Sequence, residues 1–195
     1  MSPRNQLKNA EIRQETMRKI SEAAFSLIVR QGFESTTIAQ IAREARVSKG
    51  LLYNYYVSKE ALLEKLILDA MSQGEEVIGT IFSEDPIVTM ENLIKWFFKE
   101  MRERPDQWRL ITEVTLKIDK YKFVHDIVVA KMQGYISLIQ QLLTQMGFED
   151  AEGEARLLAA LFDGIGMQAL VIREDYPLNE LEKIMINKFC KRKHP

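Results

Sequence analysis

The side chains with the clearest binding chemistry in this sequence lie in one short run, SKGLLYNYY, at residues 48–56. Lysine, tyrosine and asparagine donate hydrogen bonds to phosphate oxygens or base edges, leucine contacts thymine methyl groups, and glycine allows a close approach of the backbone. These types and their spacing suit the major groove of a duplex better than a merely solvated face. The residues concerned are Lys49, Gly50, Leu51, Tyr53, Asn54 and Tyr55.

Two short helices and a tight turn are expected to present this run. Thr36 or Thr37 can cap the first helix, in which apolar residues recur three and four positions apart. Ser48 is placed to cap the second helix, over residues 48–56. Two short helices and a turn are also a common packing unit, so this pattern alone leaves a purely structural role open. The side chains expected to face inward from the second helix are those of Val47, Leu52 and Tyr56.

A third helix is expected to follow Ser58 and to run without a break over residues 59–81. Lys59 lies in its first turn, where the helix dipole disfavours a cation. We therefore interpret Lys59 as facing a phosphate. A change in the tilt of this long helix would move the residues before it, which gives a regulatory signal a place to act.

Residues 32–63 follow the pattern G-F-x-x-T-T-I-x-x-I-A-x-x-A-x-V-S-x-G-x-L-Y-x-Y-Y-x-x-K-E-x-L-L. More than half of these positions are constrained and the match has no gaps. The arrangement resembles the DNA-binding domain of the tetracycline-repressor (TetR) family of bacterial transcription regulators. This resemblance implies that the residues near base edges are Lys49, Gly50, Leu51 and Asn54, and that the residues contacting phosphates are Thr37, Tyr53, Tyr55 and Lys59.

The sequence departs from the family pattern at one place. The family often has His-Phe where this chain has Tyr55 and Tyr56. Tyrosine keeps a hydrogen-bond donor and an apolar ring, so we expect both positions to keep their roles.

Composition and length fit an ordinary globular chain. Of the 195 residues, 46% are hydrophobic and 28% are charged, and no sustained alternation of apolar and polar residues predicts a strand. We therefore expect an all-α fold. Residues 1–60 would form the helix-turn-helix domain, with the connecting helix beginning near residue 59, and residues 61–195 would form a helical ligand-binding and dimerisation domain.

Charge is divided unevenly between these two parts. Through Glu60 there are ten Lys and Arg against six Asp and Glu, whereas the remainder has seventeen against twenty-two. A basic end on an acidic body favours a DNA-binding head, although chance fluctuation in so few charges is an alternative.

Apolar residues at helical spacing predict a further helix before the run and five beyond the connecting helix. The first of the five has a strong start, with Asp85 as cap and Pro86 in the first turn. Gly32 and Gly147 are expected to end two of the helices. The expected ranges are 9–31, 86–104, 106–118, 123–146, 154–173 and 177–189.

Large and adaptable side chains in the body are the candidates for an effector cavity. Methionine and aromatic residues can line a site for a small apolar molecule, but most such residues are plain core. The resemblance favours the cavity, because in that family this bundle holds an inducer. The candidates are Phe97, Met101, Trp108, Ile111, Met132, Tyr135, Met167 and Gln168.

The last two helices resemble the dimerisation pair of the family, which forms a four-helix bundle with a second chain. The first of them is apolar on more than one face, so it must be buried on most sides. One short helix also contacts too few bases alone, whereas two related by a two-fold axis read a pseudo-palindrome. An intrachain core is the alternative. The expected interface residues are Leu158, Phe162, Ile165, Leu181 and Met185.

Catalytic and metal-binding patterns were not found. His125 and His194 are the only histidines, and no phosphate loop or nucleophile triad is recognisable, so we expect no enzyme activity, no metal and no cofactor. Cys190 is the single cysteine, which fits a reducing cytoplasm. The N-terminus lacks a signal peptide pattern, and no apolar stretch is long enough to span a membrane, so a cytoplasmic protein is expected.

Taken together, the sequence predicts a homodimeric, ligand-responsive regulator of transcription. The expected partners are a double-stranded DNA operator and a small apolar effector that releases it, which makes a repressor the favoured interpretation. The alternative is a transcriptional activator, or a DNA-binding protein of the same fold that responds to no ligand.

Overall fold

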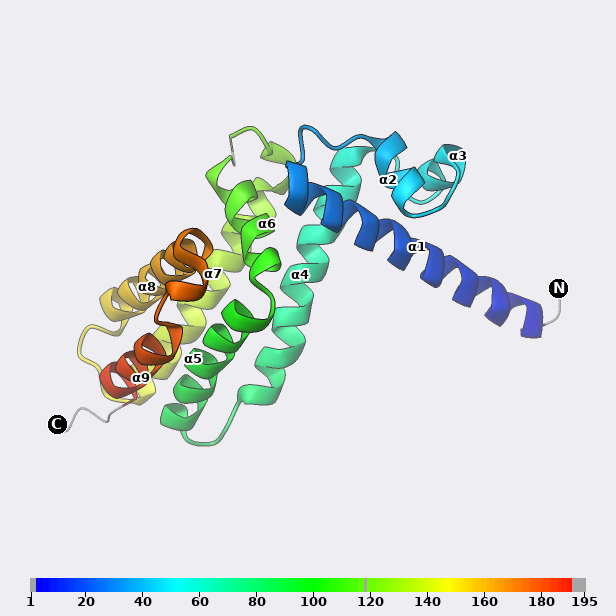
Figure 1. Cartoon of the computed structure of the whole chain (residues 1–195). Helices are drawn as coiled ribbons and strands as arrows, with labels where there is room; N and C mark the ends of the chain where they lie inside the picture. The colour runs from blue at the N-terminus through cyan, green and yellow to red at the C-terminus, as the bar shows by residue number, and fades with distance from the viewer. Residues whose placement is uncertain (1–2, 118, 191–195) are drawn as a thin grey trace. The chain divides into compact units, whose positions relative to one another are not determined.

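The computed structural model describes residues 3–117 and 119–190, and in these ranges the only regular elements are helices (Figure 1). The expected all-α fold is therefore confirmed. A single 3-10 turn, η1 (Arg173–Asp175), accompanies the α-helices. The α-helices are α1 (Pro3–Gln31), α2 (Ile38–Glu44), α3 (Lys49–Tyr53), α4 (Lys59–Ile81), α5 (Pro86–Glu103), α6 (Pro105–Leu116), α7 (Lys122–Gln145), α8 (Ala151–Ile172) and α9 (Leu178–Phe189).

The chain divides into two compact units, Met1–Ala70 and Met71–Pro195. The division falls inside α4 and not at the expected residue 60. Its physical reason is that the first turns of α4 belong to the core of the first unit, where Leu62 and Leu63 are fully buried. The helix itself continues without a break across the division.

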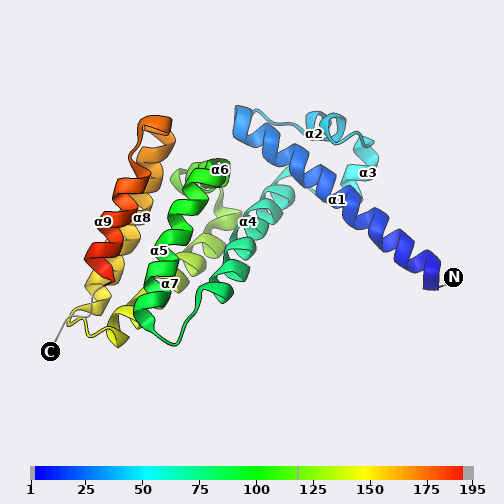
Figure 2. The ribbon, with the colours of Figure 1, turned by 60° about the horizontal axis from the view of Figure 1, so that its bottom comes forward.

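The first unit is built around α1. Its inward stripe is fully or almost fully buried, as in Ile20, Ala24 and Ile28. Gly32 ends this helix with a φ of 80°, a left-handed conformation that glycine adopts without steric cost. α1 begins at Pro3, earlier than the expected residue 9, because proline suits a first helical position. In Figure 2, α2 and α3 lie beside α1, and its first turns project past them.

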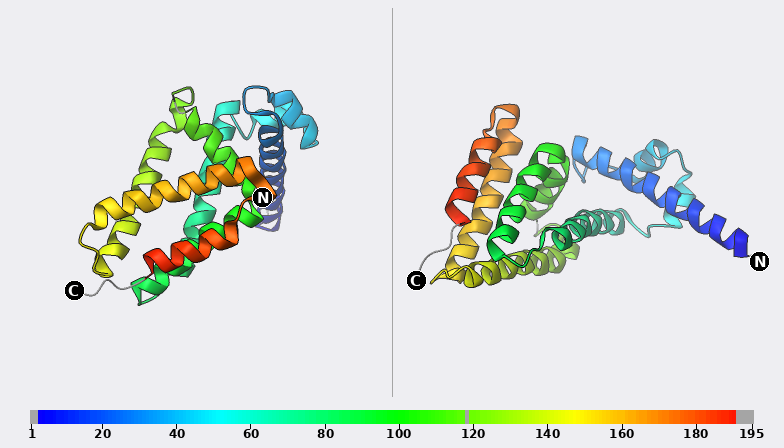
Figure 3. Two further views of the ribbon diagram at one scale, coloured as in Figure 1. Left: turned by 60° about the vertical axis from the view of Figure 1, so that its left-hand side comes forward. Right: turned by 90° about the horizontal axis from the view of Figure 1, so that it is seen from below.

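The second unit is a bundle in which α8 packs on α7 and α9 packs on α5. Figures 2 and 3 show α8 and α9 together on one side of this bundle. Asp85 caps α5 as predicted, because its side chain accepts a hydrogen bond of 2.9 Å from the backbone N–H of Ile87. The fully buried centre of the bundle contains Met90, Ile94, Phe98, Leu143, Ala155 and Leu158.

α8 is the most apolar helix of the bundle, and part of its apolar surface is exposed. By length and composition Ala151–Asp175 could cross a membrane, and only 28% of the apolar window is buried inside the chain. The length of this helix corrects the expectation that no apolar stretch is long enough to span a membrane, but one such helix is weak evidence for a membrane span. Exposed apolar side chains on this helix include Leu157, Leu161, Val171 and Ile172.

Candidate nucleic-acid interface

The start of α2 is fixed by a capping box. The Thr37 hydroxyl accepts a hydrogen bond of 3.2 Å from the backbone N–H of Gln40, and the backbone N–H of Thr37 donates to Gln40 Oε1 at 2.8 Å. Of the two threonines that the sequence offered as caps, Thr37 is therefore the one used. Thr36 is fully buried instead, and its hydroxyl donates to the carbonyl of Gly32 at 2.8 Å.

The turn between α2 and α3 contains an unusual backbone conformation. Arg46 has a φ of 56°, in the left-handed region that non-glycine residues rarely adopt. Val47 follows, and its N–H donates to the carbonyl of Ala42 at 2.9 Å. The chain thereby leaves α2 sharply and places Ser48 at the start of α3.

α3 is anchored by one face. Ser48 caps it as predicted, accepting a hydrogen bond of 3.0 Å from the N–H of Leu51. Leu52 is fully buried and Tyr56 is only 5% exposed. The α-helix covers Lys49–Tyr53, shorter than the expected residues 48–56, although the N–H of Tyr56 still bonds the carbonyl of Leu52 at 3.0 Å.

The other face of α3 is open. The side chains of Lys49, Leu51, Tyr53 and Asn54 are exposed, whereas Tyr55 is half-buried. An added Cβ at Gly50 would meet nothing within 4 Å. The structure thus brings the predicted base-edge residues together on one exposed face. Among the described residues, no acidic side chain forms an ion pair with Lys49 on that face.

Lys59 lies differently from its neighbours. Its ammonium donates hydrogen bonds to the carbonyls of Phe33 and Thr36, at 2.9 and 3.0 Å, and lies 4.2 Å from the centroid of the Phe33 ring. The first turn of α4 is thereby joined to the connection between α1 and α2. The sequence interpretation, which attributed this cation to a phosphate, did not foresee these intrachain acceptors.

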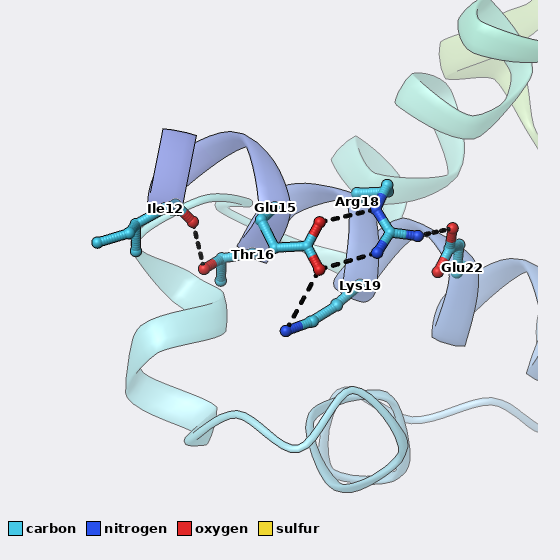
Figure 4. A network of polar contacts seen from close by, with 6 residues as sticks. All are labelled: Ile12, Glu15, Thr16, Arg18, Lys19 and Glu22. Atoms are coloured by element: carbon cyan, nitrogen blue, oxygen red, sulfur yellow. Dashed lines mark hydrogen bonds and ion pairs between the residues drawn. The ribbon is translucent and has the colours of Figure 1, made fainter. Parts of the chain in front are cut away.

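An exposed network of charges occupies the middle of α1 (Figure 4). Arg18 donates to Glu15 at 2.8 and 2.9 Å and to Glu22 at 2.5 Å, and Lys19 lies 3.4 Å from Glu15. The hydrogen bonds from Arg18 lower the pKa of Glu15 to about 2. Hence both cations of this network are neutralised by neighbours on the same helix.

The predicted effector residues divide into three groups. Phe97, Met101 and Trp108 come together, because the Phe97 and Trp108 rings meet edge to face at 5.4 Å and Gly166 packs against Trp108 and Met101. Ile111 and Tyr135 are half-buried elsewhere on α6 and α7. The exposed members of the predicted set are Met132, Met167 and Gln168.

Four of the five predicted interface residues lie in the core of this chain. Leu158, Phe162, Ile165 and Met185 are at most 9% exposed and belong to the same hydrophobic cluster, with Leu181 half-buried against it. These four side chains offer little surface to a second chain in the described conformation, and their role at an interface stays a prediction. The sequence pattern found a buried stripe but could not tell an intrachain face from an intermolecular one.

The apolar residues that remain exposed on the last two helices are different ones. They are Leu157 (61%), Leu161 (41%), Val171 (76%) and Ile172 (47%) on α8, and Ile184 (58%) on α9. On α8 they lie near one another around the helix, about a third of a turn from the buried stripe. The excess of apolar residues on α8 was visible in the sequence, so a second apolar stripe on this helix could have been predicted from it.

Comparisons with known proteins place the first unit among regulators. Residues 20–66 match the family model of bacterial regulatory proteins, tetR family. Over 65 residues the chain is 40% identical to the transcriptional regulator HbdR of Aromatoleum sp. (strain CIB), covering 33% of this chain and 28% of HbdR. The chain thus spans less than a third of that relative.

Two solved structures share the whole fold. A TetR transcription regulator from Haloarcula marismortui has a TM-score of 0.80 at 18% identity, covering 91% of this chain and 97% of that one. AibR, solved in complex with isovaleryl coenzyme A and operator DNA, has a TM-score of 0.69 at 17% identity, covering 91% of this chain and all of that one. These similarities show the fold of the whole chain, whereas the match to the tetR family model is confined to residues 20–66.

Proposed function

We propose that this protein is a transcriptional regulator that binds operator DNA through the outer face of α3. The observation that carries the proposal is the division of α3 into two faces. Leu52 is fully buried, while Lys49, Leu51 and Asn54 are exposed on the other side. Hydrogen-bond donors and an apolar contact on one exposed face of a short helix are what base recognition in a major groove requires.

The proposed assembly is a homodimer formed through α8 and α9. Leu157, Leu161 and Ile184 are large apolar side chains that are exposed in the single chain. Exposed apolar residues gathered on two helices are typical of an interaction surface, and a second copy supplies a surface of the same character. A dimer would present two α3 helices to a pseudo-palindromic site. We retain the expectation of a cytoplasmic protein as part of this proposal.

The proposed signal is a small apolar effector that releases the operator, which makes the protein a repressor. The site would include Phe97, Met101 and Trp108, which lie together beside Gly166. AibR, a protein of the same fold, was solved with an acyl coenzyme A and operator DNA. α4 supports coupling, because one continuous helix contributes to both units. A coupling of about 1–3 kcal/mol is usual for such regulators of binding.

A titration with duplex DNA tests the first part of the proposal. Fluorescence anisotropy with the purified full chain should show binding to a duplex carrying an inverted repeat from beside its coding region. It should be tighter than binding to a scrambled duplex of equal length, and both should weaken steeply with salt. Failure to bind either duplex at low ionic strength would contradict the proposal.

The effector is tested separately with two probes, isovaleryl coenzyme A and a free medium-chain fatty acid. A ligand that raises the melting temperature and lowers operator affinity in the same concentration range supports a repressor. A ligand that stabilises the protein and strengthens operator binding indicates an activator. Trp108→Ala should reduce both responses, whereas Leu116→Ala, at an exposed position on α6, should leave them unchanged.

A further inference from the structure

The cations of the first unit are not equivalent, and their positions suggest which of them meet phosphates. Arg18 and Lys19 are paired with glutamates on α1, and Arg30 lies 3.1 Å from Glu44. Such pairing opposes a contact with a phosphate, because the phosphate must compete with a carboxylate already in place. A cation that contributes to DNA binding should instead be held near α3 without an acidic partner.

Arg13 meets this description. It is exposed on α1, and no acidic partner is found for it among the described residues. Its guanidinium carbon lies 5.2 Å from the centroid of the Tyr55 ring. Tyr55 stands two residues beyond the end of α3, so the contact holds the Arg13 charge beside the exposed face of that helix. A guanidinium over a ring keeps its N–H groups free to bind a phosphate in a bidentate manner.

A second contact fixes this part of α1 relative to α3. The hydroxyls of Ser21 and Tyr56 lie 3.2 Å apart, in a hydrogen bond that joins the two segments. Arg13 is eight residues before Ser21, or about 12 Å along the helix. The position of Arg13 is thus set by the buried Tyr56 and the adjacent half-buried Tyr55.

Lys59 shows the opposite arrangement. Two of its three ammonium hydrogens are used by the carbonyls of Phe33 and Thr36, and the Phe33 ring covers the ammonium at 4.2 Å. These contacts fix the turn that leads into the Thr37 cap of α2. Removing the ammonium would leave two carbonyls short of a donor, so a loss of head stability is expected.

We infer that Arg13, held over Tyr55, is a phosphate-binding residue of the head, whereas Lys59 is a positioning residue that fixes the connection between α1 and α2. This inference rests on the proposed DNA binding. It adds a residue of α1 to the interface, and it replaces the role that the sequence pattern attributed to Lys59. The Lys59 ammonium acts on DNA through the position of α2 and α3.

The salt dependence of binding distinguishes the two roles. The logarithm of the affinity for a 30-base-pair duplex is measured against the logarithm of the salt concentration, and each phosphate contact adds about 0.9 to the steepness of the slope. Arg13→Gln should reduce the steepness by about 0.9 per bound head and weaken binding roughly five- to tenfold at 0.1 M salt. Arg18→Gln is the matched control, since it removes the same charge from the same helix at a neutralised position. It should leave the slope unchanged.

Lys59→Met completes the test. This variant should have a lower melting temperature and a lower affinity for DNA at every salt concentration. The slope of its affinity against salt concentration should equal that of the wild type. A variant that fails to fold supports the positioning role directly, and the slope of Arg13→Gln is then read by itself. The inference would be overturned if Arg13→Gln kept the salt dependence of the wild type. It would also be overturned if Lys59→Met reduced the salt dependence while the protein remained as stable as the wild type. Absence of DNA binding by the wild type would instead refute the proposed function.

Discussion

The exposed faces of α3 and α8 differ in chemistry although both belong to helices anchored by a buried leucine. On α3, Leu52 is buried and the open face carries a lysine, a leucine, a tyrosine and, at the C-cap, an asparagine. On α8, Leu158 is buried and the open face carries Leu157, Leu161 and Val171. The buried faces are alike, so the fold alone does not distinguish the two helices.

The difference indicates two kinds of partner. Polar side chains on a short helix can exchange their water for base edges and phosphates, and such an interface stays salt-dependent. An apolar face gains free energy only when another apolar surface covers it, which favours a protein partner. Each face can be altered without touching the core beneath it, and the following experiments use that property.

The largest effect is expected from the buried side of α3. Leu52→Ala should destabilise the head by about 2–5 kcal/mol, because the fully buried side chain leaves a cavity. Hydrogen exchange measured by mass spectrometry should show lost protection of amides in residues 35–63, with the amides of α8 unchanged. Leu51→Ala, at the neighbouring exposed position, should keep this protection and weaken DNA binding only. Equal effects of the two variants would contradict the two-faced description of α3.

The exposed side of α8 should decide the oligomeric state. The double variant Leu157→Glu and Leu161→Glu should raise the dimer dissociation constant at least about 100-fold, equivalent to roughly 2.7 kcal/mol, because two charges enter an apolar contact. Sedimentation velocity over a concentration series measures it. Leu116→Glu is the control, at an exposed leucine on α6. A double variant that stays as dimeric as the wild type would place the interface elsewhere.

The same substitution, glycine to alanine, tests whether a partner approaches the backbone closely at the exposed face of α3 and at that of α8. A Cβ added at Gly50 on α3 or at Gly164 on α8 meets nothing within 4 Å in the chain, and the same is true of Gly134 on α7. Alanine should therefore favour each helix by up to about 1 kcal/mol. Gly50→Ala should still weaken DNA binding roughly tenfold, and Gly164→Ala should weaken the dimer by a similar factor, about 1.4 kcal/mol each. Gly134→Ala should gain stability with neither loss. Wild-type DNA binding by Gly50→Ala and a wild-type dimer in Gly164→Ala would exclude close contacts at these two positions.

The smallest effect concerns Asp163, on the flank of α8. Partial burial raises the pKa of this carboxyl, so the folded state favours its protonated form. The group therefore contributes most to stability at pH values below its ordinary pKa, and its contribution is lost as pH rises through the folded pKa. Asp163→Asn should melt slightly higher than the wild type at pH 7, with the difference shrinking at acidic pH. If the difference in melting temperature were the same at every pH, ionisation of the Asp163 carboxyl could not be its cause.

The bounds and caps of some helices could be predicted directly from the residue types. The start of α4 at Lys59, its end at Ile81 and the caps at Ser48 and Asp85 agree with the sequence, because capping depends on a side chain and a backbone group a few residues away. α8 begins at Ala151 and not at the expected residue 154, since Asp150 supplies a cap that the apolar pattern did not reveal. The expected end of α6 at Ile118 lies outside the described residues.

The sequence by itself determined an all-helical chain, the residues on each face of α3, and the resemblance of residues 32–63 to the tetR family. These features depend on local periodicity and on short-range hydrogen bonds. Only the tertiary structure decided which apolar stripe of α8 stays inside the chain, that Arg13 lies over Tyr55, and that the Lys59 ammonium binds carbonyls 23 and 26 residues earlier. The physical reason is that periodicity shows which side of a helix is apolar, whereas the group that faces a side chain depends on how distant segments pack.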